Sequence, residues 1–279
     1  MTMRAAVLTA LVGCGFSPPA SSLGGPADAP MLSSDAHVAM PDAPVGSAAC
    51  YAPDMTGIKL CLELDDSDLV GSGIARDGSP GRHDATVTDG DVTTRPIPAS
   101  SPAQLISTTT AAPQATIQTA DDPDFDLAAL TLMAWVSPSA TPDSIDTYGL
   151  IEKRNQWVME LDSDGDLECL FAVGSANSTV GPAAISVPLD EWSLVACTYD
   201  GTRACAFVAT GGSGTGQQEC LSLDIDLAST TDHGVMIGSR WDSTLGVFNH
   251  LYGSIDSARI FDHALSASQI CLGGGRTGC

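Results

Sequence analysis

The sequence predicts an all-β protein, a sandwich or a barrel, with one short helix near its C-terminal end. Many short apolar or alternating segments have the length of single strands. Several are separated by the pairs Asp89-Gly90, Asp164-Gly165 and Asp200-Gly201, and Asp-Gly favours a tight turn between strands. The 28 glycines and 17 prolines indicate a turn-rich fold, and a hydrophobic content of 43% is enough for a core.

The expected elements follow one another from residue 58 onward, and the helix comes last. We expect the helix to begin after Ser266, because Ser266 and Gln269 have the spacing of a capping box. The expected strands are Ile58–Leu64, His83–Val87, Gln104–Ser107, Ala115–Gln118, Leu130–Val136, Tyr148–Lys153, Trp157–Leu161, Leu167–Val173, Ala183–Val187, Trp192–Tyr199, Arg203–Ala209, Val235–Gly238 and Leu251–Phe261.

The charge balance excludes one class of partner. The chain carries 34 acidic and 11 basic residues, which gives a formal net charge of −23. Such a polyanion repels phosphate backbones, so we do not expect nucleic acid as a partner. Acidic surfaces favour solubility, and they can also collect divalent cations.

The N-terminal residues resemble the signal of a bacterial lipoprotein. Arg4 gives a positive start, Ala5–Gly13 is a short apolar stretch, and Leu11-Val12-Gly13-Cys14 is similar to a lipobox. This resemblance implies a signal peptide over residues 1–13 and a lipid anchor on Cys14. The alternative is a chance cysteine in an apolar N-terminus.

Residues 14–49 differ in composition from the rest of the chain. They are rich in Pro, Ala, Ser, Gly and Asp and show no apolar periodicity, which predicts a disordered tether. We therefore expect a folded domain over residues 50–279. Gly15 after the cysteine resembles outer-membrane sorting, so the expected location is the bacterial cell envelope, as an outer-membrane lipoprotein that faces the periplasm or the cell surface.

Eight cysteines remain when Cys14 is set aside, and export leads to an oxidising compartment, so we expect four disulfides. Metal binding is the alternative, but no Cys-x-x-Cys or Cys/His cluster has zinc spacing. Across the turn at Asp200-Gly201 we expect Cys197 to lie opposite Cys205, and Cys169–Cys197 is the competing pair. The expected disulfide cysteines are Cys50, Cys61, Cys169, Cys197, Cys205, Cys220, Cys271 and Cys279.

Several segments occur in an order typical of one fold family. They are LTLMAWVSPS (130–139), GLIEKRNQWVMELDSDGDLECLF (149–171), VPLDEWSLVACTYDGTRACAFV (187–208), VMIGS (235–239) and GSIDSARIFDHALSASQI (253–270). Together they resemble laminin-G-like jelly-roll domains of the concanavalin A-like lectin/glucanase superfamily. The resemblance implies a two-sheet antiparallel jelly-roll sandwich over about residues 58–270. It does not imply one function, because this fold hosts lectins, adhesion modules, enzymes and spacers.

Catalytic motifs have little support. Glucanases of this superfamily use a strand motif Glu-x-Asp-x-x-Glu, and two segments come near it. Glu63-Leu-Asp65-Asp-Ser-Asp68 lies on the first strand and ends in Asp, whereas Glu160-Leu-Asp162-Ser-Asp-Gly165 has Gly in place of the last carboxylate. The sequence shows no Ser/His/Asp order or phosphate loop that stands out. We therefore expect no enzymatic activity.

Two short loops carry the expected ligand-binding residues. Aromatic faces stack on sugar rings, while Arg and Asn side chains bind hydroxyl groups or carboxylates. Basic residues are scarce in this chain, so their presence in two loops that the family places at sandwich edges is informative. The alternative is that the tryptophans close the ends of the core. The expected ligand-binding residues are Arg154, Asn155, Trp157, Arg240, Trp241 and Asp242.

A calcium site is also expected, since the resemblance brings the first and last strands together. Asp65 and Asp66 would then lie near Asp256, and carboxylates that cluster repel one another unless a cation intervenes. The alternative is that these acids are separately solvated.

The leading function is therefore a membrane-anchored, non-catalytic binding or adhesion module for a carbohydrate or a cell-surface protein, and we expect a monomer. A structural envelope module without a small ligand is the second hypothesis. A glycoside hydrolase is the third.

Overall fold

The computed structural model describes Cys50 and residues 56–64, 73–89, 115–143, 146–173, 176–211, 215–227, 233–242 and 246–276. Met1–Val38 and Ala39–Cys279 form separate units, and every described residue belongs to the second. The predicted signal peptide, Cys14 and tether lie outside the described residues. In the described part of the chain, no helix has the length and hydropathy needed to cross a membrane.

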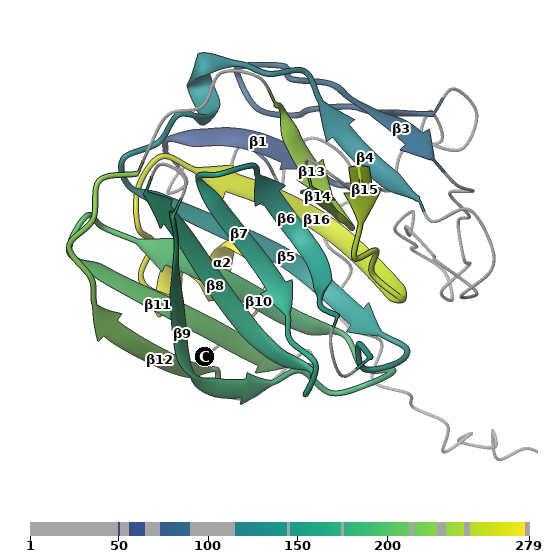
Figure 1. The fold of residues 1–279 in the computed structure, drawn as a ribbon. Helices are drawn as coiled ribbons and strands as arrows, with labels where there is room; N and C mark the ends of the chain where they lie inside the picture. Colours follow the sequence, from purple (N-terminus) through teal and green to yellow (C-terminus); the bar gives the residue numbers. More distant parts are fainter. Residues whose placement is uncertain are drawn as a thin grey trace, which may run out of the picture. The chain divides into compact units, whose positions relative to one another are not determined.

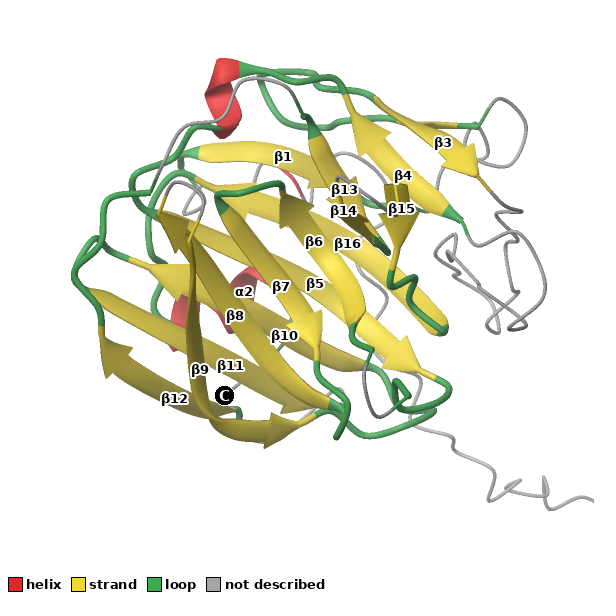
Figure 2. Ribbon diagram, in the orientation of Figure 1, coloured by secondary structure: helices red, strands yellow, loops and turns green. Residues whose placement is uncertain are grey.

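Two large antiparallel sheets form a sandwich (Figures 1 and 2). The six-stranded sheet contains β1 (Ile58–Leu62), β16 (Gly253–Phe261), β5 (Leu130–Pro138), β10 (Ser193–Tyr199), β11 (Arg203–Thr210) and β12 (Gln217–Ser222), in that order. The eight-stranded sheet contains β2 (Ile74–Ala75), β3 (Ala85–Asp89), β4 (Thr116–Thr119), β13 (Val235–Ile237), β6 (Tyr148–Lys153), β7 (Trp157–Leu161), β8 (Asp166–Val173) and β9 (Ala176–Ser186). A separate hairpin pairs β14 (Arg240–Asp242) with β15 (Gly246–Phe248). The predicted fold class, a two-sheet antiparallel jelly-roll sandwich with a short C-terminal helix, is confirmed.

The main core lies between the two sheets. Along β10 the alternate residues Val195, Cys197 and Tyr199 belong to this core. From the opposite sheet, Trp157 and Met159 of β7 reach the same core and are almost completely buried. Burial of apolar side chains from both sheets is the main force that holds the sandwich together.

The disulfides correct one prediction and confirm its competitor. Cys169 bonds to Cys197 and bridges β8 and β10 across the core, with their Cα atoms 5.7 Å apart. The predicted Cys197–Cys205 pair is wrong, because Cys197 lies opposite Ala206 in the hairpin. One residue of register places Cys205 on the outer face of the sheet, away from Cys197.

Two further disulfides join Cys50 to Cys61 and Cys205 to Cys220. Cys271 is also disulfide-bonded. Cys279 lies outside the described residues.

The outer face of the six-stranded sheet carries a second apolar cluster, under the helix α2 (Ala267–Gly273). Leu194 and Phe207 of the sheet pack there with Ile270 of the helix. The predicted capping box is confirmed, since the Ser266 hydroxyl accepts from the Gln269 N–H at 3.4 Å and the Gln269 side chain accepts from the Ser266 N–H at 2.9 Å. The helix thus begins where the sequence places it and seals this face.

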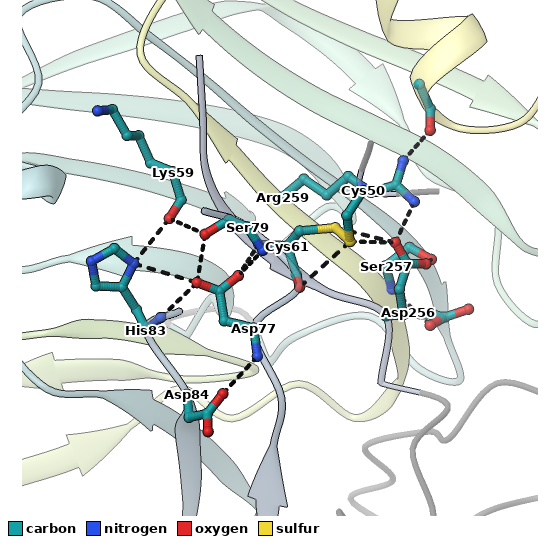
Figure 3. The surroundings of a disulfide bond; sticks show 12 residues. Cys50, Lys59, Cys61, Asp77, Ser79, His83, Asp84, Asp256, Ser257 and Arg259 are labelled. Atoms are coloured by element: carbon teal, nitrogen blue, oxygen red, sulfur yellow. Dashed lines mark hydrogen bonds and ion pairs between the residues drawn. A yellow bond between two sulfur atoms is a disulfide. The ribbon is translucent and has the colours of Figure 1, made fainter. Parts of the chain in front are cut away.

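A polar network fixes the first strand beside the Cys50–Cys61 disulfide (Figure 3). The buried carboxylate of Asp77 accepts hydrogen bonds from the backbone N–H groups of Cys61 at 2.9 Å, Ser79 at 2.8 Å and His83 at 2.7 Å. Buried carboxylates need such partners, and here they tie the loop before β3 to β1.

The last strand is joined to the first by a mostly buried ion pair, in which Arg259 Nη2 lies 2.8 Å from Glu63 Oε1. Glu63 also accepts from the Ser257 hydroxyl at 3.1 Å.

Some strands differ from those expected. β6 and β7 have the predicted bounds, whereas β9 begins earlier than Ala183 because it continues the pairing with β8. The polar strand β12 and the hairpin β14–β15 were not expected, because neither has apolar alternation. The expected strand Gln104–Ser107 lies outside the described residues.

Candidate binding site on the eight-stranded sheet

The outer face of the eight-stranded sheet carries acidic side chains, whereas the outer face of the six-stranded sheet carries the apolar cluster. Met159 and Leu161 of β7 point into the core, so Glu160 between them points to the outer face. Glu160 lies directly opposite Glu168 of β8. Glu152 of the neighbouring strand β6 pairs with Val158, on the same face as Glu160. Three adjacent strands therefore present three glutamates to one side.

The β14–β15 hairpin packs on this acidic face, in contact with β6 and β13 (Figure 1). Arg240 Nη1 lies 2.6 Å from Glu160 Oε2, and the backbone N–H of Trp241 donates to Glu152 Oε2 at 2.7 Å. Gly149 of β6 allows this close approach, because a Cβ atom there would lie 2.5 Å from the backbone of Ser239. The hairpin is thus attached by charge-assisted bonds to two of the three glutamates.

These glutamates have unusual acidities. Burial raises the pKa of Glu152 from 4.5 to about 7, although the nearby charge of Arg240 lowers it in part. Burial likewise raises the pKa of Glu160 to about 7, with Arg240 opposing and Glu168 reinforcing the shift. Burial and the charge of Asp162 raise the pKa of Glu168, which lies directly opposite Glu160.

A buried lysine at the end of β6 anchors the turn between β6 and β7. Lys153 is completely buried, and its Nζ atom lies 3.1 Å from Asp121 Oδ1 and 2.9 Å from Asp126 Oδ1. Gln156 donates to Asp126 Oδ1 at 2.8 Å. Because a buried charge must be paired, this network fixes both ends of the turn and directs Arg154 outward.

Arg154, His233 and Trp241 meet beside the hairpin. The Arg154 guanidinium lies 3.7 Å from the centre of the Trp241 ring, which is a cation–π distance. The His233 ring centre lies 4.6 Å from that of Trp241, and Arg154 also contacts the His233 ring. An indole ring that packs against two basic side chains therefore stands next to the glutamates.

The structure brings together three of the six predicted ligand residues, namely Arg154, Arg240 and Trp241. Asn155 occupies the exposed tip of the adjacent turn with a φ of 61°, a conformation that Asn tolerates. Asp242 ends β14, but its side chain lies outside the described part.

The prediction is wrong for Trp157, whose side chain is fully buried in the core and cannot reach a ligand. For this residue the alternative, a tryptophan that closes the core, holds.

Sequence reasoning missed Glu152, Glu168 and His233 as parts of the site. The only signal was a glutamate within each of the mostly apolar strands β6 and β8. Glu160 attracted attention only as part of a hydrolase motif on one strand. Its actual partners come from neighbouring strands, which a single segment cannot indicate.

Among the described residues, His83, Asp122 and Asp124 place potential metal ligands within 4.8 Å of one another. Lys59 Nζ lies 3.6 Å from Asp124 Oδ1 and already supplies a positive charge there. In the predicted calcium site, Asp256 is mostly buried on β16 and accepts from the Ser257 N–H at 2.7 Å.

The other two predicted calcium ligands, Asp65 and Asp66, lie outside the described residues. The calcium site therefore stays a prediction.

A family model described as the concanavalin A-like lectin/glucanases superfamily matches residues 111–271, more than half of the 279-residue chain. The chain belongs to this superfamily. The matched segment contains β4 to β16 and therefore includes every residue of the acidic face and the hairpin. A search of curated proteins finds no match.

Solved structures of binding domains share the fold of this superfamily member. The binding domain of botulinum neurotoxin DC in complex with SialylT has a TM-score of 0.53 at 13% identity, over 79% of this chain and 52% of that one. The same domain in complex with rat synaptotagmin II has a TM-score of 0.50 at 14% identity, over 78% and 51%. This chain thus spans about half the length of those domains.

Domain 4 of an extracellular GH43 arabinanase from Geobacillus stearothermophilus, in complex with arabinotriose, has a TM-score of 0.50 at 15% identity, over 77% of this chain and 97% of that one. At such low identities these similarities show the fold, and function must be argued from the site.

Proposed function

We propose that this protein is a non-catalytic binding module whose ligand is a carbohydrate, and that the ligand docks against Trp241. One observation carries the proposal: the Trp241 indole packs against two basic groups, Arg154 and His233, next to a face of paired carboxylates. Structural neighbours that were solved with SialylT and with arabinotriose agree with this class of ligand.

The chemistry of the site suits sugars. The apolar face of a sugar ring stacks on indole, while its hydroxyl groups both donate and accept hydrogen bonds. The half-buried carboxylate of Glu168 accepts, and the half-buried guanidinium of Arg154 donates, so the site offers both kinds of partner within one patch. A cell-surface protein is the alternative ligand, in line with the neighbour solved with synaptotagmin II.

Glycoside hydrolysis is the second candidate, because Glu160 and Glu168 converge on one face with raised pKa values. Hydrolases hold their two carboxyl groups about 5 Å or more apart, so that a sugar or a water fits between them. Here Glu160 lies directly opposite Glu168 on the neighbouring strand, and its carboxylate is engaged by Arg240 and Thr147. This arrangement favours binding over catalysis.

A glycan array tests the proposed function. Wild-type protein is expected to bind a defined set of glycans, and Trp241→Ala is expected to lose that binding. Trp135→Ala is the matched control, since Trp135 lies on the opposite sheet and donates to the Gly274 carbonyl at 3.1 Å. Binding of no glycan, or binding that Trp241→Ala leaves intact, contradicts the proposal, and release of reducing sugar during incubation favours the hydrolase.

The proposal includes an anchor in the bacterial envelope, through a lipid on Cys14 and a tether over residues 14–49. The motif Leu11-Val12-Gly13-Cys14 supports it. Cys14→Ser is expected to move the protein from the detergent phase to the aqueous phase in phase partitioning. Equal partitioning of variant and wild type would reject the anchor.

A further inference from the structure

The Cys205–Cys220 disulfide differs in position from the two other bridges between described cysteines. It joins directly opposed residues of β11 and β12, on the outer face of the six-stranded sheet. Its Cα atoms are 4.1 Å apart, compared with 5.9 Å for Cys50–Cys61 and 5.7 Å for Cys169–Cys197. Disulfides usually hold their Cα atoms about 4.4–6.8 Å apart, so this bridge spans an unusually short distance.

Accessibility also separates the three bridges. β12 ends the six-stranded sheet, its residues are mostly exposed, and Cys220 is half-buried (Figure 1). Cys169 and Cys197 are completely buried between the sheets. A thiolate must reach a sulfur atom directly in order to attack it, and among these bridges only Cys205–Cys220 offers a sulfur at the surface.

The local charge favours departure of a thiolate. Arg203 precedes Cys205 by two residues, so alternation places both side chains on one face of β11. Arg203 lies opposite Ser222, two residues beyond Cys220 on β12. A nearby guanidinium stabilises a leaving thiolate, whereas Glu219 is directed to the other face.

We propose that Cys205–Cys220 is a site of thiol–disulfide exchange with dithiol reductants, and that the two buried bridges stay intact under the same conditions. A thiolate of the dithiol attacks Cys220 Sγ, the disulfide bond breaks, and Cys205 leaves as a thiolate that takes a proton from water. The second thiol of the reductant then displaces Cys220 from the mixed disulfide. The dithiol supplies two electrons and ends as a disulfide, and the protein gains two thiols.

Reduction releases the covalent link of an edge strand. Within its sheet, β12 pairs only with β11, and Leu221 gives it partial contact with the core. Once the link is broken, β12 is held by its backbone ladder, by this contact and by its contact with β9, and it opens more easily than the central strands. Reduction of this disulfide therefore makes the β12 edge of the sandwich easier to open.

The test is stepwise reduction of the oxidised, full-length protein with dithiothreitol, followed by alkylation and peptide mapping. Cys205 and Cys220 are expected to be labelled at least about tenfold faster than Cys169, Cys197, Cys50 and Cys61. In the half-reduced protein, amide hydrogen exchange is expected to accelerate in residues 217–222 and to stay unchanged in β5 and β10.

A double variant, Cys205→Ser with Cys220→Ser, provides the control. It is expected to lose the fast phase of labelling and to show the faster exchange of residues 217–222 without reductant. Simultaneous labelling of all three pairs, or earlier labelling of a buried pair, overturns the proposal. Unchanged hydrogen exchange in both reduced protein and double variant overturns the inferred opening of β12.

Discussion

The outer faces of the two sheets differ in the chemistry of their side chains. The six-stranded sheet carries an apolar cluster that α2 covers, with Leu194, Phe207 and Ile270 packed together. The eight-stranded sheet carries Glu152 and Glu160, to which the β14–β15 hairpin is attached through polar bonds. Both covers exclude water, but apolar packing stabilises the fold, whereas burial of carboxylates costs free energy. Such costly groups are typical of functional sites, which points to the second face as the working face.

Removal of packing from the apolar face is expected to have the largest effect on the free energy of unfolding. Ile270→Ala deletes a completely buried side chain from under α2, and such truncations cost about 2–5 kcal/mol in the free energy of unfolding. Urea unfolding measures this loss. Glycan binding by the folded variant is expected to be unchanged, and weaker binding would mean that the two faces are not independent.

Overpacking the contact between the hairpin and β6 is expected to have an intermediate effect on the free energy of unfolding. Gly149→Ala places a Cβ atom against the backbone of Ser239, and overpacking of this kind costs about 1–3 kcal/mol. The displaced hairpin is expected to weaken glycan binding as well. Gly201→Ala serves as the control, because nothing lies within 4 Å of its Cβ position and only its φ of 96° opposes the change. Loss of binding in both variants, or in neither, contradicts this role of the hairpin.

The acidic face is expected to give an effect on stability that depends on pH. The pKa of Glu152 is about 7 in the folded protein against 4.5 ordinarily, so the folded state binds this proton more tightly than the unfolded state. The resulting stability is present below about pH 4.5 and is lost as the pH rises through about 7.

Glu152→Gln is therefore expected to gain stability relative to wild type as the pH rises from about 5 to about 8, by up to about 3 kcal/mol, a value that already includes the charge of Arg240. Melting temperatures measure this, with the exposed Glu191→Gln as control. Parallel curves for wild type and Glu152→Gln would show that burial does not raise this pKa.

The smallest effect concerns calcium. If Asp256 binds calcium with Asp65 and Asp66, a calcium concentration near the Kd raises the free energy of unfolding by about 0.4 kcal/mol. The melting temperature is compared in calcium and in chelator at fixed ionic strength. Asp256→Asn is expected to abolish the shift, and a shift that survives this change assigns calcium to another place.

Much of the fold could be predicted because its signals are local. Alternation gave the bounds of β6 and β7, and the capping box gave the start of α2. Disulfide pairing depends on register, and an error of one residue moved Cys205 to the wrong face of its sheet. The polar edge strand β12 has no apolar pattern, so only its pairing with β11 reveals it.

The site was only partly predictable for a related reason. Trp157 shares a face with Met159 and Leu161, so alternation alone places it in the core. Trp241 reaches Glu152 through a contact between residues 89 positions apart in the chain. Such contacts follow from sheet order, which single segments do not carry.

The four tryptophans allow the most direct test of the binding site, because they occupy four different environments. Trp157 lies in the core, Trp135 lies against α2, Trp192 precedes β10, and Trp241 lies on the hairpin. Their indole N–H signals can be resolved by NMR in protein labelled at tryptophan and titrated with the glycan that binds best on the array. The account predicts that the Trp241 signal shifts in a saturable manner while the Trp157 and Trp135 signals stay in place. A saturable shift of Trp135 or Trp192 with Trp241 unmoved would contradict it.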